Sequence, residues 1–377
     1  MILKVLKTLD EVKEIQEEWS ELLKKSANNS IYLKYEWIIA SYEVFHPLDK
    51  LRILTVRDDK NVLHCIAPLV ITKIKYRWIN LDRIGFIKNA QNPENDFICR
   101  SAMQERLLEV IMEYLCDFLE WDFIEFNMLE ENSLTTRNLK KFLQKKSAYY
   151  GTKLNRRSPY FYINCTWDEF WGCKSNRFKK SMRNKLNRVN QRGFVIQKTM
   201  ITDERVPELA DMLNISNKSW KREVGTDLLT KKGDWRFDLA LYDRLGKTGI
   251  FFLYLLKFEE IPVAYEFHIE HQGVVYPIRA DFDEGFKEVS PGSILEYEII
   301  KNLFSGKKGY EYHSCGHNYE YLLNWTDKTR DYVNVEIFNK TFSMSVLFKF
   351  EYEALVVLRK MPFYENVKKI VKTLVKV

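Results

Sequence analysis

Hydrophobic positions in the first 150 residues follow a helix period, then a strand period, and then return to a helix period. Residues 9–25 have the spacing of an amphipathic helix. Residues 51–75 predict two strands around a polar turn at 58–61, which is the pattern of a hairpin. The same reasoning predicts strands over 78–87, 96–99 and 121–129, and helices over 104–119 and 136–146.

The second part of the chain repeats this plan after residues 151–164, which predict a crossing strand or a connector. A helix is predicted over 175–192 and ends at Gly193. A second hairpin, again around an acidic turn, is predicted over 250–272. The remaining predicted elements are helices over 204–220, 237–249 and from 294 onward, strands over 194–200, 273–286, 309–315 and 331–338, and helices to the C-terminus.

This recurrence of helix, hairpin, strand, helix and strand, without matching residues, predicts two α/β domains of like topology. We expect an N-terminal domain over residues 1–150, a second domain over 151–340, and C-terminal helices over 341–377 that pack on the core. The sheets should be mixed and mostly antiparallel, with helices on their faces. No low-complexity linker divides the halves, so they should share an interface.

The composition is that of a folded, mildly basic protein. A hydrophobic content of 46% and an aromatic content of 14% argue against disorder. The net charge of +7 permits an anionic ligand without requiring one. The six cysteines form no CxxC pair, so no metal site or disulfide framework is predicted. The N-terminal stretch lacks a signal-peptide pattern and no apolar run has membrane-spanning length, which favours a cytoplasmic protein that could lie at the inner face of the membrane.

One short stretch, EVSPGSILEYEII at residues 288–300, suggests chemistry. Ser290-Pro291-Gly292-Ser293 stands directly before a run with helical apolar spacing. Pro and Gly break regular structure, and a serine there is typical of an N-cap. The stretch predicts a loop that presents free N–H groups to a phosphate, with an ordinary capped helix as the alternative. Neither Walker A nor GxGxxG is present, which disfavours a nucleotide triphosphatase or a Rossmann dehydrogenase.

The surrounding residues resemble a known superfamily. The hairpin, the strand ending in RADFDE and the run SPGSILEYEIIKNLFSGKKGYEYHSCGHNYEYLLNW resemble the GNAT acyltransferases. The segment is similar in particular to BioF-like and cellulose-biosynthesis-protein-like acetyltransferases, which are relatives of the FemABX aminoacyltransferases. The resemblance covers about residues 170–330 and reaches the first half only by architecture. It implies two tandem GNAT-like acyl-CoA N-acyltransferase domains.

The resemblance also implies a donor site. In GNAT proteins the loop before the central helix binds the pyrophosphate of acyl-CoA, and acetyl-CoA is the expected donor here. Acyl transfer in the family is direct: a base takes the amine proton, backbone N–H groups stabilise the oxyanion, and an acid protonates the leaving thiolate. The positions that match the phosphate-binding loop are Val289, Ser290, Gly292, Ser293 and Ile294.

A Tyr-Lys pair often follows the last glycine of this region in the family. This chain has GHNYEYLLNW, where Tyr321 or Tyr319 matches the tyrosine and Leu322 or Glu320 stands in place of the lysine. This departure keeps open a non-catalytic binding module with a degenerate site. Trp220 lies where the family commonly has a tryptophan before a mobile loop, which implies a wall of the acceptor pocket or, alternatively, core packing.

Ionisable residues on the predicted strands supply candidate catalytic groups. Glu266 and His268 are two residues apart on one strand and therefore point to one face, which is either its solvent side or the wall of a site. Arg279 and Asp281 share a face of the next strand, as a salt bridge or as a substrate clamp. We take Glu266, His268, Asp281 and Tyr321 as catalytic candidates.

Two histidines, His313 and His317, flank Cys315 at a strand end and the following loop. No third metal ligand lies nearby in the sequence, so titratable residues of an acceptor pocket are favoured over a zinc site. Together with Trp220, Arg279 and Tyr319 they are the predicted substrate-binding residues. Cys315 itself is expected to be a small buried side chain rather than a nucleophile.

A basic helix is the main candidate for contact with a partner. Residues 174–192 contain eight basic residues and no acidic one, with an apolar stripe on one side. The basic face is either solvated or directed at an anion, which could be a CoA phosphate, a nucleotide-linked sugar, a membrane surface or tRNA. The sequence ENVKKIVKTLVKV at the C-terminus predicts a short basic amphipathic helix that either touches a membrane or caps its own domain.

The resulting hypothesis is an N-acyltransferase that moves an acyl group from acyl-CoA to an amine. The acceptor would be a small molecule or an amine on a sugar or cell-envelope polysaccharide precursor, and the envelope context comes from the resemblance alone. FemABX relatives use aminoacyl-tRNA, so a FemABX-like aminoacyltransferase acting on a peptidoglycan precursor is the alternative that the basic helix supports.

Overall fold

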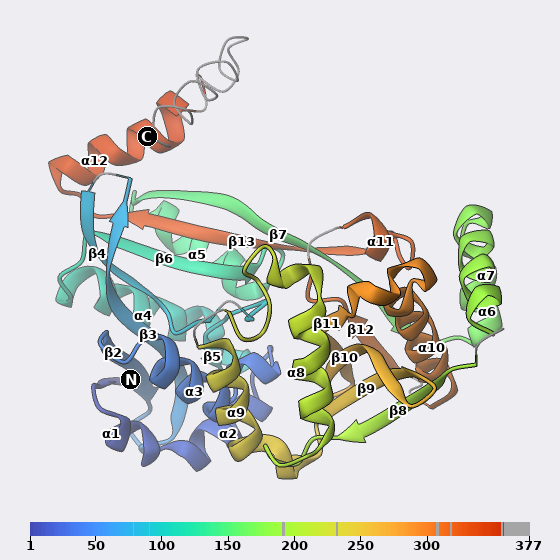
Figure 1. Cartoon of the computed structure of the whole chain (residues 1–377). Coiled ribbons are helices and arrows are strands. Elements are labelled where there is room, and N and C mark those ends of the chain that lie inside the picture. The colour runs from blue at the N-terminus through green and yellow to red at the C-terminus, as the bar shows by residue number, and fades with distance from the viewer. Residues whose placement is uncertain are drawn as a thin grey trace.

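The structure is a computed structural model that describes residues 1–77, 79–89, 91–190, 193–230, 233–306, 309–316, 319–355 and 357. Strands occur in runs along the described chain, with helices between the runs (Figure 1). The strands are β1 (Ile2–Leu6), β2 (Lys50–Arg57), β3 (Leu63–Tyr76), β4 (Ile79–Phe86), β5 (Ile98–Cys99), β6 (Phe123–Glu130), β7 (Tyr149–Ile163), β8 (Val195–Met200), β9 (Phe251–Phe258), β10 (Ile261–His271), β11 (Val274–Phe282), β12 (Tyr310–His313) and β13 (Thr329–Phe338). The α-helices are α1 (Leu9–Lys13), α2 (Gln16–Lys24), α3 (Tyr35–Phe45), α4 (Gln104–Phe118), α5 (Leu134–Lys145), α6 (Trp167–Gly172), α7 (Asn176–Asn190), α8 (Glu208–Lys218), α9 (Asp234–Leu245), α10 (Pro291–Gly306), α11 (Glu320–Leu323) and α12 (Phe342–Lys349).

The described strands form one continuous sheet. Its order is β1-β2-β3-β4-β6-β13-β7-β12-β11-β10-β9-β8, with β5 paired to β3 beside this path. Two pairs in this order are parallel, β4 with β6 and β11 with β12, and each is joined by a crossover that contains α4 or α10. Each half therefore has antiparallel strands, a crossover helix and a parallel strand, so the predicted mixed and mostly antiparallel α/β class is confirmed.

The two halves exchange their last strands. β13 follows β12 along the chain, yet it pairs with β6 of the first half, and β7 pairs with β12 of the second half. Val333, Val335 and Ile337 of β13 are buried in the core of the first half. β7 and β13 run side by side across the join between the halves (Figure 1). The division at residue 150 falls inside β7 and stays a prediction, and most of the C-terminal helices predicted over 341–377 lie outside the described residues.

Helices cover both faces of each half. In the first half, α4 and α5 pack on one face, and α2 and α3 pack on the other. In the second half, α8 and α9 cover the face that carries Tyr265, while α6, α7 and α10 cover the opposite face. Trp37 of α3 packs edge-on against Phe237 of α9, with ring centroids 5.1 Å apart. The halves therefore share a buried interface, as expected from the absence of a linker.

Local sequence explains several elements and the departures from prediction. The turn between β9 and β10 uses Glu259 and Glu260 at φ 47° and 67°, which suits the right-handed twist of a two-residue hairpin. The helix predicted over residues 9–25 is instead two helices, α1 and α2, interrupted between them. The sequence did not predict α3, because its buried residues surround the helix and leave no polar stripe with a helix period.

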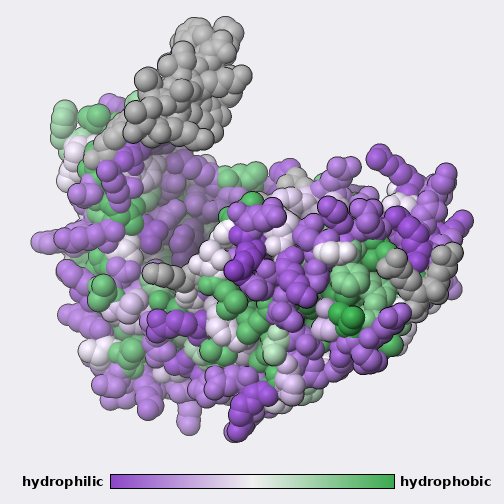
Figure 2. All heavy atoms as spheres, in the orientation of Figure 1, coloured by the Kyte–Doolittle hydropathy of each residue, from purple (hydrophilic) through white to green (hydrophobic). Residues whose placement is uncertain are grey.

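The surface shown in Figure 2 is mostly hydrophilic, with hydrophobic side chains gathered in smaller patches. In the part of the chain that the structure describes, no helix combines the length and the apolar character needed to span a bilayer.

Candidate active site

The predicted phosphate loop is a tight turn at the start of α10. Ser290 adopts the left-handed conformation, with φ 54° and ψ 53°, and reverses the chain into the helix. Pro291 is the first helical residue, a position where its missing N–H costs nothing. The N–H groups of the first turn, including those of Gly292 and Ser293, have no partner within the helix. The turn at 290–293, called the SPGS turn below, therefore presents backbone donors at the positive end of a 16-residue helix.

Two cations of the basic helix lie against this turn. The Lys185 Nζ donates to the Ser293 Oγ over 2.9 Å, and an Arg188 NH donates to the Glu288 carbonyl over 3.0 Å. The apolar stripe of α7 fixes this placement, because Met182 and Val189 are buried in the core that also contains α10. Burial lowers the pKa of Lys185. An anion at the SPGS turn would therefore meet helix N–H groups and positive side chains together.

A carboxyl and an imidazole lie buried under α10. Glu266 and His268 point to the same face of β10, and their Oε2 and Nε2 atoms are 2.7 Å apart. The two residues are 5% and 0% exposed, which rules out the solvent-facing alternative. Burial raises the pKa of Glu266 and lowers the pKa of His268, which favours a neutral carboxylic acid beside a neutral imidazole.

A second carboxyl lies on α10 itself. Burial, and then the Glu266 carboxyl, raise the pKa of Glu296. The first turn of α10 contains no acidic residue. The raised pKa values of Glu266 and Glu296 favour their neutral forms, which limits the repulsion between these two carboxyls and an anion bound at the SPGS turn.

A family model described as an acetyltransferase (GNAT) domain matches residues 176–321. Residues 176–321 form a GNAT domain. The match includes α7, the Glu266–His268 pair, the SPGS turn and Tyr321, so all features described above belong to this domain. No curated protein matches the sequence at a significant level.

The whole chain is similar in fold to several solved structures. FemX has a TM-score of 0.58 at 12% identity, covering 92% of this chain and 100% of FemX. L-PGS from Bacillus licheniformis has a TM-score of 0.54 at 10% identity, over 88% of this chain and 94% of that one. The C-terminal domain of a putative lysylphosphatidylglycerol synthetase from Agrobacterium fabrum has 0.53 at 8% identity, over 89% and 94%. At these identities the similarity concerns the fold alone, and the predicted resemblance to a GNAT domain is confirmed by the family model over residues 176–321.

The tyrosines predicted near the end of the GNAT domain stand at its surface. Tyr319 precedes α11 and Tyr321 lies within it, and their rings stack 5.9 Å apart. They are 52% and 57% exposed. Partial burial, and then the carboxyls of Glu296 and Glu266, raise the pKa of Tyr321 to about 12. Its phenol is therefore protonated at neutral pH and can donate a proton.

Asp281 lies on the opposite face of the GNAT sheet from Glu266. Its carboxylate accepts hydrogen bonds from Ser219 over 3.0 Å and from Tyr265 over 2.9 Å, and it pairs with Lys221 over 2.8 Å. These three partners tie β11 and β10 to the segment that follows α8. This arrangement is that of a structural anchor, and the predicted catalytic role of Asp281 stays a prediction.

The other predicted residues on this face are also held apart from the SPGS turn. Arg279 pairs with Asp234 over 3.5 Å and forms no described bond with Asp281, although both lie on one face of β11. Trp220 begins a 3-10 turn directly after α8 and is 47% exposed. The described contacts do not test whether Arg279 or Trp220 binds a substrate, so both binding roles stay predictions.

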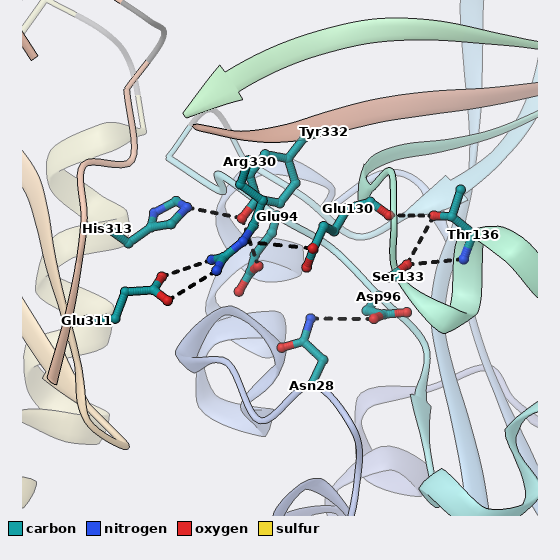
Figure 3. Close-up of polar contacts among 10 residues, drawn as sticks. All are labelled: Asn28, Glu94, Asp96, Glu130, Ser133, Thr136, Glu311, His313, Arg330 and Tyr332. Carbon is teal, nitrogen blue, oxygen red and sulfur yellow. Dashed lines mark hydrogen bonds and ion pairs between the residues drawn. The ribbon is translucent and has the colours of Figure 1, made fainter. Parts of the chain in front are cut away.

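His313 lies between the halves rather than beside the SPGS turn. Its Nε2 is 3.0 Å from the Tyr332 hydroxyl, and that hydroxyl donates to Glu94 over 3.3 Å (Figure 3). Burial lowers the pKa of His313 to about 3, so the ring is neutral. Cys315 follows it and is partly buried, and burial raises the pKa of its thiol to about 12, which does not suit a nucleophile. His317 lies outside the described residues.

A cavity of about 430 Å³ lies beside His313, between the two halves. The first half contributes Glu94, Asp96 and Glu130, and the second half contributes Glu311 and Arg330. Figure 3 shows Arg330 between two carboxylates, bound to Glu311 over 2.9 and 3.1 Å and 3.8 Å from Glu130. The cavity, called the interhalf pocket below, was not predicted, because its residues are spread from position 27 to position 330.

The SPGS turn and the interhalf pocket are on opposite faces of the GNAT sheet. Val275 and Tyr312 pack with α10, whereas Val274 and Tyr276 face the interhalf pocket. The parallel pairing of β11 with β12 ends at Val275 and Tyr312, and the rest of β11 has no described partner on that side. Within the described residues, no group of three or more His, Cys, Asp or Glu is arranged to hold a metal ion.

Proposed function

We propose that this protein is an N-acyltransferase that takes an acyl group from acyl-CoA, with acetyl-CoA as the preferred donor. The observation that supports the proposal is the convergence of Lys185 and Arg188 on the SPGS turn. A pyrophosphate needs several N–H donors and positive charge in one place, and the start of α10 supplies both. The GNAT match over residues 176–321 supports the same class of reaction.

In the proposed reaction the donor phosphates bind at the SPGS turn and the thioester lies where β11 and β12 separate. The acceptor amine attacks the thioester carbon, the C–N bond forms, and the C–S bond breaks. The nitrogen loses one proton and the thiolate gains one. Tyr321 is the proposed donor to the thiolate, because its phenol is protonated and it stands near Glu296. The proton that the amine releases passes to water in this proposal, because the neutral Glu266–His268 pair has no basic group to accept it.

The acceptor in this proposal is an amine on a small molecule, a sugar or a cell-envelope precursor. The reaction would take place in the cytoplasm or at the inner face of the membrane. These assignments rest on the GNAT class of the domain and on the fold that the chain shares with FemX.

The test is calorimetric titration of the protein with acetyl-CoA and longer acyl-CoAs, with Gly292→Asp as the variant. A Cβ at Gly292 would lie 3.6 Å from Phe282, an ordinary contact, so Gly292→Ala is a matched control for the added side chain. Ala102→Asp adds the same charge just before α4 and controls for the charge itself. Micromolar binding that only Gly292→Asp loses supports the proposal. A folded wild type that binds no acyl-CoA contradicts it.

An aminoacyl-tRNA donor is the second candidate, favoured by the outer face of α7. Arg177, Lys180 and Arg183 are exposed there and have no ion pair among the described residues. A phosphate backbone would bind such a face with strong salt dependence. RNA that copurifies with the protein, and that Lys180→Glu with Arg183→Glu removes, would support this donor. A purified protein free of RNA, with no affinity for aminoacyl-tRNA at low salt, would contradict it.

A further inference from the structure

The interhalf pocket has an excess of negative groups. Four carboxyl side chains line it, and Arg330 is the guanidinium among them. Both terminal nitrogens of Arg330 donate to the Glu311 carboxylate, and its Nε is 3.8 Å from Glu130. None of the described ion pairs includes Glu94 or Asp96. Burial raises the pKa of Glu94 and the Arg330 charge opposes that rise, but the Arg330 guanidinium is paired with Glu311 and is not a dedicated partner of Glu94 or Asp96.

The pKa values of Asp96 and Glu94 are changed by their burial in the pocket wall. Asp96 is 6% exposed, and its oxygens accept from Thr135 over 2.7 Å, from the Phe97 N–H over 2.8 Å and from Asn28 over 3.4 Å. Burial raises the pKa of Asp96 to about 7 and also raises the pKa of Glu94. A buried carboxyl with a raised pKa is stabilised in its ionised form when a positive charge is placed next to it.

A second observation points to a ligand that donates hydrogen bonds. Gln104 also lines the interhalf pocket and is 4% exposed. Its Nε2 donates to Thr135 over 2.6 Å, whereas its Oε1 has no hydrogen-bond partner among the described residues. A buried amide oxygen without a partner is costly, and it can only accept. A bound N–H group would satisfy it.

We propose that the interhalf pocket binds the acceptor substrate through a primary ammonium group, with Glu94 and Asp96 as its anionic partners and Gln104 as a further acceptor. This inference rests on the proposed transfer to an amine. Both halves contribute to the site. The first half supplies these three residues, and the second half supplies Arg330, whose guanidinium is paired with Glu311. The ligand class is a small amine or an amino sugar, which a cavity of about 430 Å³ can enclose.

The first test compares amines with neutral molecules of the same shape. The full-length protein is titrated by calorimetry with cadaverine against 1,5-pentanediol, and with glucosamine against glucose. We expect one amine at least to bind about tenfold or more tightly than its neutral counterpart, the ratio for one hydrogen bond to a charged group. Cadaverine that binds should release protons, visible as a buffer-dependent binding enthalpy, because the cation favours ionised carboxyls. Magnesium chloride at equal ionic strength controls for a general cation effect.

The second test removes one carboxylate at a time. Glu94→Gln keeps the size of the side chain and an oxygen that can accept from Tyr332, so it should fold. It should lose about tenfold in affinity for the amine and leave binding of the neutral molecule unchanged. Glu21→Gln, at an exposed position on α2, is the matched control and should change nothing. Asp96→Asn repeats the test at the other carboxyl if Glu94→Gln fails to fold.

The outcomes separate this inference from the proposed function. Failure of every amine to bind more tightly than its neutral counterpart would overturn the ammonium site, even if acyl-CoA binds at the SPGS turn. Amine binding that Glu94→Gln leaves intact would also overturn it. Amine binding lost in Glu94→Gln, in a protein that binds no acyl-CoA, would support the pocket and refute the proposed donor.

Discussion

The two halves place a helix at the same point of the same topology, and the two helix starts differ in charge. α10 begins at the SPGS turn without an acidic residue in its first turn, and two cations of α7 lie over it. α4 begins after a 3-10 turn with no side-chain cap, and Glu105 in its first turn pairs with Lys141 over 2.6 Å. An anion would therefore be attracted more strongly to the first site than to the second. The halves repeat an architecture, but the proposed donor site lies in the second half.

The central strands show the same contrast. β3 of the first half buries Cys65, Ile66, Ala67, Leu69 and Val70 completely. β10 of the second half interrupts a similarly buried strand with the Glu266–His268 pair. A buried polar pair stabilises a strand less than apolar packing does, which agrees with the predicted functional role of Glu266 and His268. The first half instead contributes residues to the wall of the interhalf pocket and strands to the shared sheet.

The largest effect should come from breaking the strand exchange. Val335 of β13 is fully buried in the core of the first half, although it lies late in the sequence. Val335→Asp would bury an unpaired charge and should lower the free energy of unfolding by more than about 4 kcal/mol. Hydrogen exchange followed by mass spectrometry should show lost protection in β2, β3 and β6.

Val346→Asp on α12, where the side chain is 51% exposed, should leave that protection unchanged. If Val335→Asp loosened the second half alone, the halves would be independent despite the shared sheet.

The second prediction concerns pH and the carboxyl that the first half places in the interhalf pocket. Burial raises the pKa of Asp96 to about 7 from an ordinary value near 4, so the folded protein binds one more proton than the unfolded chain between these values. The free energy of unfolding that Asp96 contributes is fully present below pH 4 and is lost as the pH rises through 7. The slope is about 1.4 kcal/mol per pH unit at most. Urea unfolding at several pH values should show this loss in the wild type, and Asp96→Asn should remove it.

Asp331→Asn is the matched control, because its pairing with Arg157 lowers the pKa of Asp331 and gives a dependence of the opposite sign. A difference between wild type and Asp96→Asn that does not change between pH 4 and 8 would contradict the assignment.

The third prediction makes the central strand of the second half resemble that of the first. His268→Leu leaves the Glu266 carboxyl buried without its partner and should cost about 1–3 kcal/mol in the free energy of unfolding. Glu266→Leu combined with His268→Leu should restore most of that stability, because replacing both partners by apolar groups is close to neutral. Urea denaturation of the two single variants and the double variant gives the coupling energy. Additive costs would show that the pair does not interact.

These contrasts also show what the sequence could predict. The SPGS turn, the basic helix and the hairpin around Glu259 were visible because each depends on neighbours in the chain. The sequence placed Glu266 with His268 correctly on one face, since strand geometry alone decides this. It could not decide whether that face was buried, because burial depends on α10, which is packed on it from elsewhere in the chain.

The sequence could not predict the interhalf pocket, for a related reason. Glu94, Glu311 and Arg330 are far apart in the sequence and meet only because β7 and β13 exchange places. His313 had been predicted to bind substrate, and among the predicted site residues that the structure describes it is the one that lines this pocket. No sequence motif pointed to the pocket, and the sheet order revealed it.

The smallest effect uses a feature that both halves share. Thr8 caps α1 and Thr166 caps α6, each in a capping box with a glutamate three residues later. Thr8→Ala and Thr166→Ala should each lower the free energy of unfolding by about 1 kcal/mol. Because the halves share one sheet and exchange strands, both variants should shift the same unfolding transition by similar amounts, measured by circular dichroism and tryptophan fluorescence together. The contrary result would be two unfolding transitions, of which Thr8→Ala shifts one and Thr166→Ala shifts the other. It would mean that the exchanged strands do not couple the halves. The two helix starts compared above would then belong to two units that fold separately.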